Sequence, residues 1–204
     1  MFFFRHNISK YMPAFSERCD LITSPVDGHA YKPKVIWFTG LSGAGKTTLA
    51  NALQTFFKQK GLPCVNFDGD ILRKGINKDL GYSDNDRMEN IRRASEIAKL
   101  FIAQQTFVIC SFITPLESMR FMAEEIISHE KFILVYVNCS LDVCEQRDVK
   151  GMYQQARKGS IKDFTGIHSL YEPPIQPDIE INSGQWELQQ SISFLTEKVQ
   201  LLII

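Results

Sequence analysis

Short apolar runs alternate with longer amphipathic stretches along most of this 204-residue chain. The runs are strand-sized, and the first four are apolar enough for a parallel sheet that is covered on both faces. Five strands are expected, at 34–39, 63–67, 106–111, 131–137 and 178–181. Because strands and helices alternate, the pattern predicts a three-layer α/β fold with a mostly parallel five-stranded sheet and right-handed crossovers. Ligands of such folds bind at the carboxyl ends of the strands.

Capping residues mark two helix starts. Ser83 is a good N-cap, and Asp84 and Asp86 suit the first turn of the helix that would follow it. Apolar residues then recur at helical spacing, at Ile91, Ala94, Ile97, Ala98 and Phe101. A further helix is expected to begin after Ser140.

Two segments break this alternation. Residues 1–33 contain Pro13, Pro25 and Gly28 without a sustained period, so we interpret them as an N-terminal extension that is loosely structured or packed on a partner. Residues 148–177 are rich in Lys, Arg, Gly and Pro, and loops of this length are usually lids or disordered. We therefore expect one domain over 34–204, with 148–177 as its lid segment.

Charge and cysteine content exclude several classes of protein. The chain carries 23 basic and 23 acidic side chains, and this balance removes the long-range attraction on which nucleic-acid binding usually depends. Its apolar runs are too short to cross a membrane, and the opening MFFFRHNISK is too short for a secretory signal. The five cysteines and four histidines show no metal-ligand spacing, and Cys64 and Cys110 are expected in the core. We expect a cytoplasmic protein without nucleic-acid or membrane partners.

The stretch GLSGAGKT, residues 40–47, matches the G-x-x-x-x-G-K-[ST] pattern of phosphate-binding loops. It follows an expected strand and opens an expected helix, which argues against the alternative of a glycine-rich turn with a surface lysine. Backbone N–H groups of such a loop face the phosphates, Lys46 reaches the outer phosphates, and Thr47 offers a hydroxyl to Mg²⁺. The pattern predicts an ATP-type site made by Gly40, Leu41, Ser42, Gly43, Ala44, Gly45, Lys46, Thr47 and Thr48.

A second polar motif, FDGD, ends the expected second strand and places Asp68 and Asp70 beside the phosphate loop. A carboxylate there can hold a metal-bound water or orient an acceptor hydroxyl, which makes Asp68 a candidate catalytic residue and metal ligand. The same letters are also ordinary turn chemistry, with Asp70 capping a short helix. The motif alone leaves both interpretations open.

Four longer runs resemble the adenylylsulfate kinase family, in the same order. They are DGDILRKGINKDLGYSDNDRMENIRRASEIAKLF at 68–101, SFITP at 111–115, RDVKGMYQQARKGSIKDFTGI at 147–167 and YEPP at 171–174. The resemblance spans roughly residues 34–184 and implies a P-loop kinase fold. It further implies transfer of the γ-phosphate of ATP to the 3′-hydroxyl of adenylylsulfate, which gives 3′-phosphoadenylylsulfate and ADP. A homodimer is implied as well, and association with sulfate adenylyltransferase is compatible with it.

The family positions also imply an acceptor pocket. The residues that match them are Asp70, Arg73, Tyr82, Arg87, Asn90, Phe112, Ile113, Lys150, Phe164 and Thr165. Guanidinium groups suit the phosphosulfate, and aromatic faces suit the adenine, which we assign to Tyr82 and Phe164. In isolation, such an arginine would be interpreted as a solvated helix face and such an aromatic as core.

Ser111 and the basic lid residues complete the candidate site. The matching serine is a phosphoserine intermediate in some family members, but in-line transfer does not require a covalent step, so we prefer Ser111 as a hydrogen-bonding wall residue. Arg147, Lys150 and Lys158 are expected to bring positive charge over the phosphates, with Arg147 near the ATP base.

The chain departs from the family pattern at Ile71, Leu116, Glu117 and Val149. Two other functions also stay open. One is another small-molecule P-loop kinase, such as a gluconate or nucleoside monophosphate kinase. The other is a nucleotide-sensing module that binds ATP and adenylylsulfate but transfers phosphate poorly.

Overall fold

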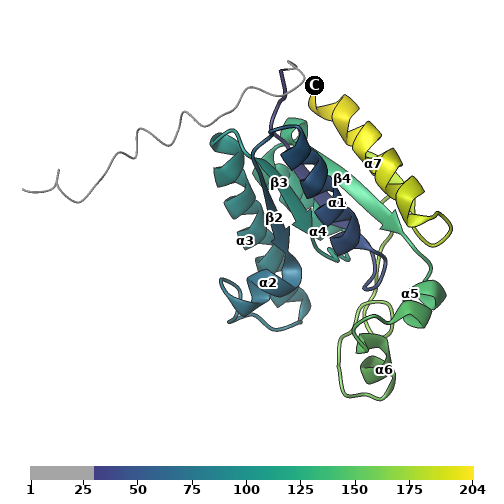
Figure 1. Ribbon diagram of the computed structural model, residues 1–204. Helices are drawn as coiled ribbons and strands as arrows, with labels where there is room; N and C mark the ends of the chain where they lie inside the picture. The colour runs from purple at the N-terminus through teal and green to yellow at the C-terminus, as the bar shows by residue number, and fades with distance from the viewer. Residues whose placement is uncertain (1–29) are drawn as a thin grey trace, which may run out of the picture.

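The computed structural model describes residues 30–204, in which five strands form one sheet (Figure 1). The strands are β1 (Val35–Thr39), β2 (Cys64–Asp68), β3 (Phe107–Ser111), β4 (Phe132–Asn138) and β5 (Ile179–Asn182). Their order across the sheet is β2-β3-β1-β4-β5, and every neighbouring pair is parallel. All five expected strands are confirmed, each beginning one residue later than expected.

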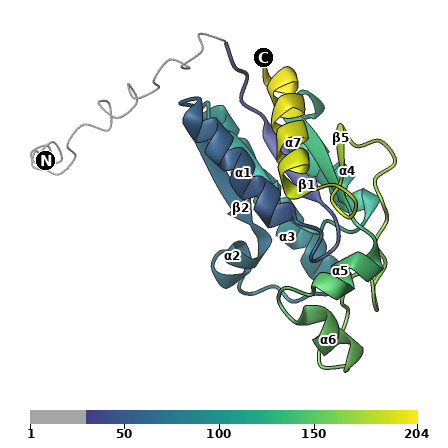
Figure 2. The same cartoon turned by 45° about the vertical axis from the view of Figure 1, so that its right-hand side comes forward.

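Helices lie on both faces of the sheet. They are α1 (Lys46–Gln59), α2 (Gly69–Lys74), α3 (Asp84–Ala103), α4 (Glu117–Ile127), α5 (Leu141–Arg147), α6 (Met152–Arg157) and α7 (Leu188–Ile203), with a short 3₁₀ turn at His129–Lys131. Alternate β1 side chains divide the core: Ile36 and Phe38 pack with α1 and α7, and Val35 and Trp37 pack with α3 and α4. Figure 2 shows α1 and α7 side by side on one face, and in both views α2, α5 and α6 gather at one end of the sheet.

The sheet is covered less completely than the apolar pattern of its strands indicates. β2 is an edge strand, and all five of its residues are only partly buried. Asn66 of this strand donates from its amide to Asn51 of α1, at 3.0 Å. Cys110 is fully buried in β3, whereas Cys64 is only partly buried at the sheet edge.

Both capping predictions are confirmed. Ser83 caps α3 and accepts a hydrogen bond from the Asp86 backbone N–H at 3.2 Å. Ser140 caps α5 in the same way and accepts from Val143 at 3.3 Å. The proposed cap at Asp70 is wrong, because the N-cap of α2 is Asp68.

The expected N-terminal extension falls almost entirely outside the described residues, as does Cys19. Where the described chain begins, the Lys32 N–H donates to the carbonyl of Ile203 at 2.7 Å, which ties this end to the last turn of α7. Within residues 30–204, no helix is long and apolar enough to span a membrane.

The lid segment, residues 148–177, contains α6 and folds back onto the phosphate loop. The Asp148 carboxylate accepts from the first N–H groups of α6, those of Tyr153 and Gln154, both at 3.0 Å. Tyr153 then donates its hydroxyl to the Ser42 carbonyl at 2.9 Å. Its ring also packs edge-on against Phe164, with centroids 4.9 Å apart.

Gly40 allows the turn after β1 to pass close to β4. Its φ is +146°, and a Cβ at this position would lie 2.6 Å from the Val137 carbonyl oxygen. Gly45 provides a matched comparison, because its φ is +106° but a Cβ added there would have no atom within 4 Å. A side chain at Gly40 would therefore meet both backbone strain and a steric clash, and one at Gly45 would meet strain alone.

We expect Gly40→Ala to lower the free energy of unfolding by about 1–3 kcal/mol more than Gly45→Ala does, because only Gly40 adds an overpacking cost. Urea unfolding followed by circular dichroism measures both values. Equal losses for the two variants would contradict the close approach of this turn to β4.

Candidate active site

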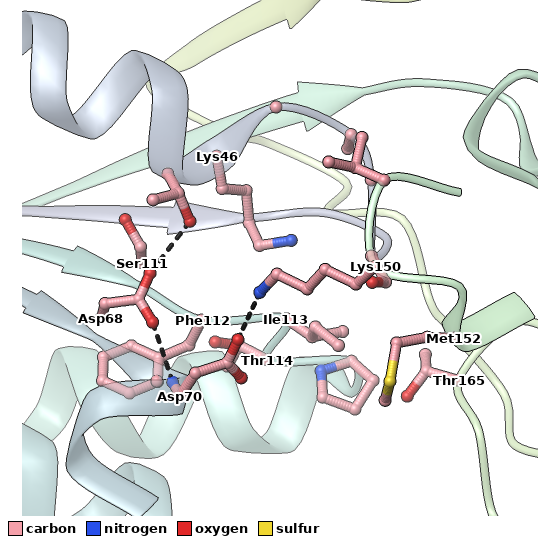
Figure 3. Close-up of a pocket in the computed structure, with 18 of the residues that line it drawn as sticks. Lys46, Asp68, Asp70, Ser111, Phe112, Ile113, Thr114, Lys150, Met152 and Thr165 are labelled. Atoms are coloured by element: carbon pink, nitrogen blue, oxygen red, sulfur yellow. Dashed lines mark hydrogen bonds and ion pairs between the residues drawn. The ribbon is translucent and has the colours of Figure 1, made fainter. Parts of the chain in front are cut away.

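A cavity of about 610 Å³ lies where the carboxyl ends of β1, β2 and β3 meet. The phosphate loop, the start of α2, the first half of α3 and the lid segment all contribute to its lining. Figure 3 shows Lys46, Asp68, Ser111 and Lys150 converging there from different elements. The cavity is therefore the expected crevice at the carboxyl edge of a parallel sheet.

The phosphate loop forms one wall. Residues Ser42 to Thr48 line the cavity, and Gly40 and Leu41 lie just behind them. The Lys46 ammonium donates to the carbonyl oxygens of Gly40 at 2.9 Å and Leu41 at 2.8 Å, so its end is tucked under the loop. Desolvation there, with a smaller contribution from the positive charge of Lys150, lowers the pKa of Lys46 to about 8.

A chain of polar groups runs from α1 to the lid segment. The Thr47 hydroxyl donates to Asp68 Oδ2 at 2.9 Å, and Asp68 Oδ1 accepts from the Asp70 backbone N–H at 2.9 Å (Figure 3). Asp70 in turn forms an ion pair with Lys150. Asp68 thus has both a capping role and a place in the cavity, so the turn chemistry of the motif belongs to Asp68 and is compatible with a role in the site.

The Thr47 hydroxyl and the Asp68 carboxylate are hard oxygen donors on one side of the cavity. Among residues 30–204 there is no group of three or more His, Cys, Asp or Glu side chains suited to a metal ion. Mg²⁺ does not need such a cage, because it usually keeps several waters and binds through one or two carboxylates and substrate phosphates. The donors present therefore fit Mg²⁺.

The end of β3 and the loop after it form the floor of the cavity. Ser111, Phe112 and Ile113 line it, and the Ser111 hydroxyl is buried with no hydrogen-bond partner. Thr114 follows with φ of +41° and is fixed by Trp37 Nε1, which donates to its hydroxyl at 2.9 Å. The buried Arg120 guanidinium donates to the Thr114 carbonyl at 2.9 Å.

The opposite half of the cavity contains the basic and aromatic residues that matched the family motifs. The Arg73 guanidinium stacks over the Tyr82 ring at 4.5 Å. Arg87 donates to the Tyr82 carbonyl at 2.8 Å and to the Thr165 hydroxyl at 3.0 Å, which links α3 to the lid segment. Asn90 lies on the same face of α3 as Arg87, and both are buried.

The two aromatic candidates occupy different environments. Tyr82 is 57% exposed, whereas Phe164 is 8% exposed and packs on Tyr153. Both line the cavity. A planar ligand would therefore meet one fixed ring and one ring that is open to solvent.

The basic lid residues are only partly where they were expected. Arg147 lies beside the phosphate loop and donates to the carbonyls of Gly43 at 3.4 Å and Ser183 at 2.7 Å. Lys150 reaches into the same part of the cavity as Lys46 (Figure 3). Lys158 does not line the cavity, because it caps the end of α6 on the exposed side.

Sequence reasoning missed the residues at the far end of the phosphate-loop wall. Ser183, Trp186, Leu188 and Ser191 line the cavity there, and the Ser191 hydroxyl is buried with no hydrogen-bond partner. They follow β5, whose carboxyl end lies on the same edge as those of the other strands. Their position after a predicted strand is the feature of the sequence that could have indicated them, because no motif marks these residues.

Of the four departures from the family pattern, only Val149 lines the cavity. Ile71 is 66% exposed on α2 and does not line it, and Val149 lines it but is 83% exposed. Leu116 caps α4, and Glu117 forms an ion pair with Arg120. None of the four departures falls on Lys46, Asp68, Ser111 or Lys150, which converge in the cavity.

Comparison with known proteins agrees with this geometry. The adenylylsulphate kinase family model matches residues 32–182. Adenylyl-sulfate kinases of Prochlorococcus marinus and Bacillus velezensis are 47% identical over 169 residues and 46% identical over 170 residues. Both alignments cover 83% of this chain, with 84% of the first protein and 86% of the second.

A solved structure of related sequence has the same fold. The structure of the Mycobacterium tuberculosis APS kinase CysC in complex with AMPPNP and APS matches with a TM-score of 0.80 and 36% identity. The match covers 84% of this chain and 99% of that chain. By its cavity, its motifs and these relatives, the chain belongs to the adenylylsulfate kinase family.

Proposed function

We propose that the chain binds ATP along the phosphate loop and adenylylsulfate between α2, α3 and the lid segment, and transfers the γ-phosphate to the 3′-hydroxyl. The observation that carries this proposal is that both halves open into one cavity, with Asp68 and Ser111 between them. An in-line reaction then needs no covalent enzyme intermediate. The 3′-oxygen bonds to the γ-phosphorus while its proton passes to the Asp68 carboxylate, the bond to the β–γ bridging oxygen breaks, and ADP leaves.

The donor half supplies positive charge. Lys46 turns from the loop carbonyls to the outer phosphates, and the N–H groups at the start of α1 face the same phosphates. Arg147 and the residues after β5 lie where the base would extend from the loop. Thr47 and Asp68 would hold Mg²⁺, which would supply positive charge to neutralise the negative charge that develops during transfer.

The acceptor half supplies orientation. Arg73 and Arg87 present guanidinium groups for the phosphosulfate, and Phe164 and Tyr82 present ring faces for the adenine. Asp68 orients the 3′-hydroxyl and accepts its hydrogen bond. The Ser111 hydroxyl, buried beside it without a partner, is suited to hydrogen-bond a substrate oxygen as a wall residue.

The family resemblance also supports four further proposals. We infer that the enzyme acts as a homodimer in the cytoplasm, with a lid over residues 148–177, and that it is able to associate with sulfate adenylyltransferase. Light scattering of the purified chain, alone and mixed with that enzyme, tests both assemblies.

The binding of ATP should depend on the charge of Lys46. Because its pKa is about 8 in the free enzyme, the protonated amine that attracts phosphates is lost as the pH rises above 8. We expect ATP affinity to fall by up to about tenfold per pH unit above this value, measured by isothermal titration. Lys46→Ala should abolish this dependence and lower turnover by orders of magnitude, with melting little changed. A wild-type affinity that is flat between about pH 7 and 9.5 would contradict the assignment.

The two carboxylates should differ in their effect on turnover. Asp68→Asn keeps the helix cap, since Asn is an equally good N-cap, but removes the charge that orients the hydroxyl. We expect kcat to fall far more than ATP affinity does, with a nearly unchanged melting temperature. Asp70→Asn breaks only an exposed ion pair with Lys150 and should have a milder effect. Small and equal effects on kcat would favour a purely structural role for the motif.

The aromatic residues should determine acceptor affinity. Phe164→Leu retains much of the packing on Tyr153 but removes the ring face, so it should weaken adenylylsulfate binding by about ten- to a hundredfold. Tyr82→Phe should be nearly silent, and Tyr82→Ala should resemble Phe164→Leu. Titration with adenylylsulfate in the presence of ADP measures these affinities. If Phe164→Leu weakened ATP binding instead, the ring would belong to the donor half.

A further inference from the structure

Arg93 lies outside the cavity but contacts the loop that builds the acceptor half. This loop, residues 75–83, joins α2 to α3. Arg93 donates from Nη1 and Nη2 to the two oxygens of Asp79, at 2.8 and 2.9 Å, and Nη1 also donates to the Ile76 carbonyl at 3.3 Å. Its Nε donates to Glu89, one turn earlier on α3, at 2.8 Å. Every nitrogen of the guanidinium group therefore links the rigid helix to the loop or to Glu89 beside it.

The other side of the same loop contacts the proposed acceptor residues. The Gly81 carbonyl accepts from Arg73 at 2.6 Å, and the Tyr82 carbonyl accepts from Arg87 Nε at 2.8 Å. The fully buried Asn77 donates from its side-chain amide to Asn90 Oδ1 at 2.9 Å. The loop thus orients both guanidinium groups and the amide of this half.

The loop has little apolar anchoring of its own. Ile76 is 59% exposed and Tyr82 is 57% exposed. In α2, which precedes the loop, no residue is fully buried. Its position therefore depends on polar contacts, and the two-pronged Arg93–Asp79 pair is the contact with the most restrictive geometry.

We propose that Arg93 is a positioning residue for acceptor binding, which holds the 75–83 loop so that Arg73, Arg87 and Tyr82 face the adenylylsulfate site. The inference rests on the proposed acceptor half. Removal of Arg93 does not change which residues line the cavity. It releases the loop whose carbonyls orient Arg73 and Arg87. Acceptor binding should weaken while the phosphate loop, on the other side of the cavity, is unaffected.

Arg92 is a matched control on the same helix. It also pairs with Glu89, donating at 2.7 and 2.9 Å, and carries the same charge. Its side chain is 46% exposed, and its ion pair reaches Glu89 without reaching the loop. The two arginines thus differ chiefly in their connection to residues 75–83.

The test is steady-state kinetics with each substrate varied at saturation of the other. Arg93→Ala should raise the KM for adenylylsulfate by about tenfold or more and leave the KM for ATP within about twofold, since a tenfold change is modest for loss of a charged, two-pronged contact. Arg92→Ala should change neither value. Arg93→Lys should give an intermediate KM, because an ammonium group lacks the planar fork that matches both Asp79 oxygens. Asp79→Asn should raise the acceptor KM as well, and adding it to Arg93→Ala should have little further effect.

Two results would overturn the inference. One is an unchanged acceptor KM in Arg93→Ala, whatever its melting temperature, and the other is an equal rise of both KM values. Arg87→Ala separates this failure from failure of the proposed acceptor half. If the acceptor half is correct, Arg87→Ala raises the acceptor KM even where Arg93→Ala does not.

Discussion

The active site depends on the parallel register of three adjacent strands. Asp68, the last residue of β2, is paired with Ser111, the last residue of β3, and Ser111 is paired with Phe38 of β1. Two residues after Phe38 the phosphate loop begins. Because parallel strands end on the same edge, this register alone brings the phosphate loop, a carboxylate and the floor of the cavity together. A slip of one residue in either pairing would turn Asp68 or Ser111 to the opposite face of the sheet.

The loops beyond this edge are held by polar contacts as well as by apolar packing. Trp37 and Arg120 fix Thr114 in a left-handed conformation, which sets the direction of Phe112 and Ile113. Tyr171 and Glu172 anchor the far end of the lid segment: the Tyr171 hydroxyl lies 3.1 Å from that of Thr39, and the Glu172 N–H donates to Pro115 at 2.8 Å. Such contacts restrict geometry strongly, because each buried group left without its partner costs about 1–3 kcal/mol. These contacts thereby fix the loops that line the cavity.

The sequence predicts those parts of the molecule that are specified by local chemistry. Apolar runs locate all five strands, Ser83 and Ser140 locate helix starts, and the glycines and Lys46 locate the phosphate loop. Parts that depend on contacts between distant segments were not predictable in this way. The capping role of Asp68 depends on how sharply α2 turns away from β2, and the place of Trp186 and Ser191 depends on the last crossover. Whether Phe164 is buried depends on Tyr153, and an isolated aromatic residue gives no indication of that.

The central claim is that one cavity joins an ATP site to an adenylylsulfate site. The most direct measurement is ADP release with ATP and a panel of acceptors that includes adenylylsulfate, gluconate and nucleoside monophosphates, with ³¹P NMR of the product. We expect turnover with adenylylsulfate as the only acceptor, and a new phosphomonoester at its 3′ position. Rapid phosphate transfer to another acceptor, or tight binding of adenylylsulfate without turnover, would contradict it.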